Sequence, residues 1–244
     1  MTGLLGSEWL KIGTTRTLLW YLLGIVVVVG VTIAGQVTSA PDDVLSDVEG
    51  FVDVLEAATW VSLFALLFGL IGVTGEYRHE TITQTFLAAP VRERVVGAKL
   101  LTYAGAGLFL GVVALVLTVA MALPWLAAKG VDPPLGERSV ALFIIGLLGT
   151  TALWGALGVA FATVVPNQVA AIVSAFVWLL ILETVLAGLA PDVARYSPRS
   201  AAGALMRVEG EDALSMWEGA AVTLFYIAGL AVLGSQLVIR RDVT

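Results

Sequence analysis

The stretch TGEYRHETITQTFLAAPVRERVVGAKL, residues 74–100, is a charged island between two long apolar runs. It contains His79, the only histidine of the chain, together with three arginines. An apolar run of about 20 residues is long enough to cross the hydrocarbon core of a membrane as a helix. The stretch therefore predicts a polar connector between two membrane-spanning helices.

The composition indicates that most of the chain lies in a membrane. Of its 244 residues, 59% are hydrophobic and 13% are charged, and the mean hydropathy is +0.96. Soluble domains carry about 25% charged residues. The absence of cysteine excludes a disulfide framework and a cysteine metal site. With a single histidine, a histidine-rich metal cluster is also excluded, and we expect no metal-site residue and no nucleic-acid partner.

Six apolar runs predict an all-α membrane protein, with one transmembrane domain over residues 1–244. The expected spans are residues 18–37, 57–73, 100–126, 140–164, 169–187 and 217–239. Residues 1–17 are expected to form an interfacial amphipathic segment, 75–99 a cytoplasmic connector, and 188–216 an outer loop that contains short helices. Trp60 and Trp217 fall near span ends, where aromatic side chains gather at the membrane interface.

The distribution of basic residues predicts the orientation of these spans. With the N-terminus inside the cell, eight Lys and Arg residues lie on the cytoplasmic side and five on the outer side. The positive-inside rule favours this arrangement. We therefore expect a multi-pass protein of the plasma membrane with both termini in the cytoplasm.

The first outer connection, DDVLSDVEGFVDVLE at residues 42–56, has helical spacing. Val44, Val48, Phe51 and Leu55 follow one another at i, i+4, i+7 and i+11, and the acids occupy the other face. This pattern predicts an amphipathic helix that lies at the outer surface or extends the second span.

No set of residues predicts an enzyme. The single histidine lies in the connector, so a serine hydrolase would have no histidine base inside the membrane. The G-x-x-x-x-G-K-[ST] phosphate loop is absent. If ATP drives this protein, another chain must hydrolyse it, so we expect no catalytic residue and no cofactor in this chain.

The connector itself predicts a short helix. Thr81 and Gln84 match a capping box, and Pro90 disfavours a helix beyond Ala89. Ile82, Phe86 and Ala89 would then share one apolar face. That face would lie on lipid headgroups or enter a groove on a cytoplasmic partner; alternatively, the connector is an ordinary interfacial loop whose arginines only follow topology.

Glu183 is the one acid well inside an apolar run. A charge at that depth costs a few kcal/mol unless it is paired or hydrated, so Glu183 is a candidate for the substrate path. The alternative is a structural role, in which it reaches the interface or a neighbouring arginine such as Arg195. Gly107, Gly111, Gly155 and Gly158 are expected at close helix contacts.

Taken together, these features resemble the membrane permease of ABC type-2 exporters over essentially the full chain. The matching connector residues are Glu76, Tyr77, Arg78, Thr81, Ile82, Thr85, Pro90, Arg92, Arg94 and Lys99. Glu80 stands where the family commonly has glycine. The N-terminal segment SEWLKIGTTRT, in which Trp9 and Ile12 follow Leu5 at helical spacing, resembles the interfacial connecting helix of the family.

The resemblance implies that the connector is a coupling helix that docks on a separate nucleotide-binding ATPase subunit. Two such subunits, which bind ATP and Mg²⁺, would assemble with two permeases, and the second permease would be an identical or a related chain. The assembly would export a substrate, which the sequence does not identify, by alternating access. The implied interface residues are Glu76, Tyr77, Arg78, His79, Glu80, Ile82, Phe86, Leu87, Pro90 and Arg92.

Two other functions remain open at this stage. A secondary transporter or a channel would need no ATPase, but such proteins usually have several polar groups at mid-depth, and here only Glu183 qualifies. A non-transporting membrane anchor or immunity protein would recruit partners without moving a substrate.

Overall fold

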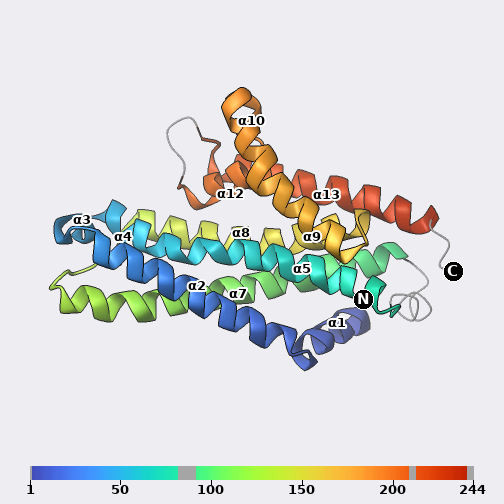
Figure 1. Cartoon of the computed structure of the whole chain (residues 1–244), viewed down its shortest axis with the longest axis horizontal. Helices are drawn as coiled ribbons and strands as arrows, with labels where there is room; N and C mark the ends of the chain where they lie inside the picture. Colours follow the sequence, from blue (N-terminus) through green and yellow to red (C-terminus); the bar gives the residue numbers. More distant parts are fainter. Residues whose placement is uncertain (1, 82–91, 209–212, 241–244) are drawn as a thin grey trace.

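A computed structural model describes residues 2–81, 92–208 and 213–240, and over these residues the chain is helical with no strand (Figure 1). Six helices are long and apolar enough to cross a membrane within this described part. They cover Thr17–Ser39, Val48–Arg78, Glu93–Ala128, Arg138–Val164, Gln168–Leu189 and Met216–Leu237. The expected all-α fold with six candidate membrane spans is therefore confirmed over these residues.

The helices that make up these spans are as follows. Four spans are single helices: α2 (Thr17–Ser39), α7 (Arg92–Ala128), α8 (Arg138–Val164) and α13 (Met216–Arg240). The second span consists of α4 (Val48–Leu55), the 3-10 helix η1 (Glu56–Trp60) and α5 (Val61–Arg78). The fifth span consists of α9 (Gln168–Phe176), the π-helix η2 (Val177–Leu182) and α10 (Glu183–Leu189). Four shorter helices lie outside the spans in the described ranges: α1 (Thr2–Thr14), α3 (Asp42–Ser46), α11 (Pro191–Ala194) and α12 (Pro198–Met206).

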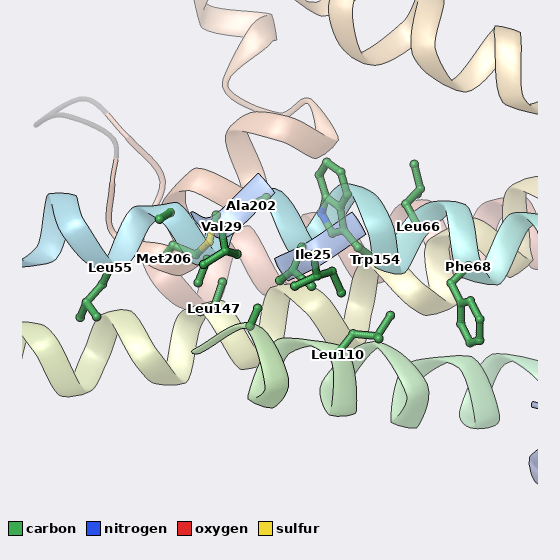
Figure 2. Close-up of a cluster of buried hydrophobic side chains, with 14 of the residues drawn as sticks. Ile25, Val29, Leu55, Leu66, Phe68, Leu110, Leu147, Trp154, Ala202 and Met206 are labelled. Atoms are coloured by element: carbon green, nitrogen blue, oxygen red, sulfur yellow. The ribbon is translucent and has the colours of Figure 1, made fainter. Parts of the chain in front are cut away.

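Helix α8 is the centre of the bundle and packs against α5, α7 and α13. Gly158 of α8 lies where a Cβ atom would collide with the backbone of Leu66 in α5, and Gly107 of α7 has the same relation to Thr151 of α8. These glycines let the helix backbones approach closely, as expected. Figure 2 shows large side chains such as Leu110 and Leu147 that fill the core around these contacts.

The second span is longer than the run 57–73 because α4 and η1 continue directly into α5. Phe51 and Leu55 of α4 are buried, as the amphipathic pattern requires, but Val44 is 43% exposed and Leu45 is buried instead. The reason is a break at Asp47, whose extended backbone separates α3 from α4 and shifts the helical phase.

The fifth span diverges from the bundle. Helix α9 packs against α5, whereas η2 and α10 point away from α8 (Figure 1). The chain then returns through α11 and α12, and α12 packs against α13 and α8. The short helices expected within residues 188–216 are thus present in the described part of that loop.

The N-terminal helix α1 packs against α7 at the end of the bundle where α5 ends and α9 begins (Figure 1). Trp9 of α1 lies against Gly105 of α7, where a Cβ atom would meet the indole ring. Ile12 is buried, with 5% of its surface exposed. This placement brings the polar residues of α1 next to the connector ends.

Candidate functional site

Four charged side chains form a closed ring at the end of the bundle where α1 packs against α7. We call it the ionic ring, and its members are Glu8, Lys11, Glu76 and Lys99. Lys99 Nζ lies 2.8 Å from Glu8 Oε2 and 2.6 Å from Glu76 Oε1. Lys11 Nζ lies 2.7 Å from Glu8 Oε1 and 2.9 Å from Glu76 Oε1. Each cation contacts both carboxylates, so the ring is neutral overall.

The ring is buried on one side and open on the other. The side chains of Glu8 and Lys99 are 4% and 3% exposed, and that of Glu76 is 11% exposed, whereas Lys11 is 44% exposed. Charges taken out of water at this depth are tolerated only when they are paired with good geometry. The inner pair therefore requires the ring to stay closed.

The charges of the ring shift the pKa values of both members in α1. Burial alone would raise the pKa of Glu8, but its attraction to Lys99 and its hydrogen bonds to Lys11 and Lys99 outweigh burial and lower its pKa. Burial alone would lower the pKa of Lys11, but its bonds to Glu8 and Glu76 raise its pKa. Both shifts favour the charged forms that close the ring.

The ring joins three helices that are separate in sequence. Glu8 and Lys11 belong to α1, Glu76 lies in the last turn of α5, and Lys99 lies in the first turns of α7. Helices α5 and α7 lead into and out of residues 82–91. The ring therefore fixes α1 to both ends of the connector.

The end of α5 has a left-handed cap. His79 N–H donates to Gly75 O, Glu80 N–H to Tyr77 O and Thr81 N–H to Glu76 O, which is the Schellman pattern of helix termination. Glu80 carries the left-handed backbone, with φ 57°. This conformation explains why glycine suits that position better than glutamate.

A hollow of about 630 Å³ lies beside the ring. Its walls include Lys11 and Glu76 of the ring, His79 at the end of α5, and Gln168 at the start of α9. Arg78 Nη1 donates to Gln168 Oε1 over 3.3 Å and connects α5 to the fifth span. The hollow is thus bordered by charged and polar groups from α1, α5 and α9.

The structure describes only part of the expected coupling interface. Glu76 belongs to the ring, Tyr77 packs on the core, Arg78 bonds to Gln168, and His79 and Glu80 are exposed. Ile82, Phe86, Leu87 and Pro90 lie outside the described residues. Helix α7 begins at Arg92, whose side chain is not among those that the structure describes.

Glu183 lies on α10 and is 4% exposed. Its Oε2 accepts a hydrogen bond from the Ser197 hydroxyl at 2.8 Å and another from the Arg199 backbone N–H at 3.1 Å. These bonds link α10 to the start of α12. Arg195, the arginine that was expected as the partner of Glu183, instead places its guanidinium over the Tyr196 ring. The contacts favour the structural alternative for Glu183.

Sequence reasoning did not select Glu8 and Lys11 as site residues. They stand three residues apart on α1, a spacing that usually indicates a solvated surface pair. The connector motif did include Glu76 and Lys99, but no local pattern joined them to the N-terminal helix. No group of three or more His, Cys, Asp or Glu that would suit a metal ion occurs within the described ranges.

Comparisons with protein-family models and with curated proteins gave no match for this chain.

Proposed function

We propose that this chain is the membrane subunit of an exporter that is driven by a separate ATPase. Six spans, no phosphate loop and a charged connector between the second and third spans support this assignment. In this proposal the short helix expected within the connector, Ile82 to Ala89, receives the force of ATP binding from the ATPase subunit, and the spans convert that force into alternating access.

The observation that carries the proposal is the ionic ring. A push on the connector would reach the end of α5 and the start of α7, and each of these helices holds one member of the ring. Because Lys99 also binds Glu8, helix α1 has to move with them. Three helices would thereby respond as one unit.

The packing of α8 offers a route for this movement into the membrane. Helices α5 and α7 both lie against α8 at glycine contacts, where backbones meet without intervening side chains. Such smooth contacts suit helices that slide or rock between two arrangements. Two copies of this chain, or this chain and a related one, would enclose the substrate path.

Co-purification tests the proposal. The neighbouring reading frames are first searched for an ATPase, and the lack of one would count against the proposal. That ATPase is expressed with the tagged chain, which is then extracted in mild detergent and captured. We expect the wild type to retain the ATPase and the Phe86→Asp variant to lose it, because a charge on the apolar face of the connector would prevent its burial in a partner groove.

The matched control is Leu135→Asp, which places the same charge at an exposed leucine of the connection between α7 and α8. This variant should retain the ATPase. Equal retention by Phe86→Asp and the wild type, or no capture by the wild type, would favour a secondary transporter, a channel or an anchor.

A further inference from the structure

A second hollow, of about 370 Å³, lies far along the bundle from the ionic ring, between η1, the start of α5, α8, η2 and α12. Thr59 and Leu63 form one wall, Leu179 and Leu180 another, and Ala202 and Met206 a third. Trp154, Ala202 and Met206, which line this hollow, are labelled in Figure 2.

Two buried hydrogen-bond donors in this hollow are unused. Neither the Ser62 hydroxyl nor the Trp154 indole N–H has a hydrogen-bond partner among the residues that the structure describes. Ser62 is 5% exposed and Trp154 is 6% exposed, and both line the hollow. A buried polar group without a partner is costly. Water or a ligand with acceptor oxygens in the hollow would satisfy both donors.

The same hollow carries one charge of each sign. Arg199 of α12 and Glu56 of η1 both line it. An arginine together with two neutral donors suits a phosphate, because the guanidinium binds phosphate oxygens in a planar fork. The Glu56 carboxylate suits an amine. The polar lining of the hollow thus suits a zwitterionic head that has a phosphate and an ammonium group.

A separate apolar cavity of about 130 Å³ lies beside this hollow, and Leu179 lines both. On α5, Leu66 and Leu70 follow Ser62 at intervals of one turn and line the apolar cavity. On α8, Leu157 and Phe161 follow Trp154 in the same way.

The two cavities therefore lie side by side along α5 and α8 with Leu179 common to both, and we call the pair the groove. The rise from Ser62 to Leu70 corresponds to about 12 Å along the helix. The groove changes from polar to apolar over this length, which matches a ligand that has a polar head and an alkyl chain.

We propose that this groove binds a single-chain amphiphile with a phosphate-and-amine head, such as a lysophospholipid. The phosphate accepts from Ser62, Trp154 and Arg199, the ammonium lies at Glu56, and the alkyl chain occupies the cavity beyond Leu179. The inference concerns a binding site of this chain alone and does not depend on the proposed export function.

A binding experiment with lysophosphatidylethanolamine tests the site. The purified full-length chain in maltoside micelles is titrated with this probe, and the bound fraction is measured by native mass spectrometry. We expect one bound molecule. The Ser62→Ala, Trp154→Phe double variant should bind at least roughly tenfold more weakly, because it loses two hydrogen bonds while it keeps the shape of the groove.

The control pair is Ser174→Ala with Trp217→Phe, which makes the same chemical changes at exposed positions outside the groove. It should bind like the wild type. Equal affinity of the groove variant and this control would overturn the proposal.

Two further measurements separate the contribution of the ligand's head group from that of its alkyl chain. Glycerophosphoethanolamine, the head without its chain, should compete poorly, and Ala175→Leu, which fills the apolar cavity, should weaken binding of the probe. Effective competition by the head alone would show that the apolar cavity takes no part.

Photocrosslinking provides a readout on the wild-type chain, independent of any variant. A lysophosphatidylethanolamine with a diazirine in its alkyl chain should label peptides that contain Leu66, Leu157 or Leu179. Labels spread over the lipid-facing surfaces of α2 and α13 would contradict a defined site.

Discussion

Lys99 and Glu8 are 91 residues apart in the sequence, yet Lys99 Nζ lies 2.8 Å from Glu8 Oε2 in a buried ion pair. This contact joins the N-terminal helix to the helix that follows the connector. Glu76 completes the link from the helix that precedes it. The polar end of the bundle is therefore organised around one buried cation that two carboxylates share.

The first prediction concerns the loss of that cation. Lys99→Met leaves Glu8 and Glu76 buried with only the half-exposed Lys11 as a counter-charge. Breaking a buried ion pair by removing one partner costs about 3 to 5 kcal/mol. We expect a lower unfolding midpoint in detergent, measured by tryptophan fluorescence during a denaturant titration.

The control for this prediction is Lys129→Met. Lys129 Nζ lies 2.9 Å from Asp42 Oδ1, but these side chains are 30% and 62% exposed. The substitution should therefore lower the free energy of unfolding by less than about 1 kcal/mol. A triple variant that also replaces Glu8 and Glu76 with leucine should recover much of the stability, because no buried charge then lacks a partner. Similar losses for Lys99→Met and Lys129→Met would refute the shared-cation interpretation.

The second prediction is a pH dependence of α1 docking. The pKa of Glu8 is lowered from 4.5, so its contribution to stability is present above that value and is lost as the pH falls through the lowered pKa. The pKa of Lys11 is raised from 10.5, so its contribution is present below that value and is lost as the pH rises through the raised pKa. Docking should therefore hold across neutral pH and fail at both extremes.

Spin labels measure this docking directly, because the chain has no cysteine of its own. Gly6→Cys on α1 and Arg94→Cys on α7 are exposed sites for the labels. The distance distribution should stay narrow at neutral pH and broaden in strong acid. Glu8→Gln should broaden it already at pH 7, and a narrow distribution in that variant would contradict the prediction.

The sequence allowed the six spans to be predicted because each is a long apolar run that the membrane thickness dictates. The limits of the second span were harder to predict. The helix break at Asp47 buries Leu45 in place of Val44, and the periodicity of the sequence does not reveal this break. The ionic ring could not be predicted, because Glu8 meets Lys99 only through tertiary packing.

The left-handed cap illustrates a different limit. The resemblance marked Glu80 as unusual where glycine is common, and the structure gives the physical reason in its positive φ of 57°. The unused donors of Ser62 and Trp154 had no signal in the sequence at all. Serine and tryptophan in apolar helices are ordinary, and only their shared cavity distinguishes them.

The third prediction follows from that cap. Glu80→Gly should stabilise the chain by about 0.5 to 1 kcal/mol, because glycine adopts a left-handed backbone without the steric cost of a Cβ atom. The measurement is the unfolding midpoint in detergent. Glu137→Gly is the matched control, since Glu137 has φ −76° and offers no such relief. A gain in the control as large as in Glu80→Gly would remove the backbone explanation.

The fourth prediction concerns the contact between α10 and α12. Glu183→Ala removes the acceptor of the Ser197 hydroxyl and of the Arg199 N–H, and should cost about 1 to 3 kcal/mol because both donors lose a partner in a buried site. Glu183→Gln keeps one oxygen acceptor and should lose less. Hydrogen exchange should become faster at the first amides of α12 in the alanine variant.

Thr184→Ala serves as the control. It removes an exposed hydroxyl that donates to Leu180 O, one turn earlier along the same span, and should leave the exchange of those amides unchanged. If Glu183→Ala protects α12 as well as the wild type does, the carboxylate does not hold α10 to α12, and a role for Glu183 on the substrate path gains weight.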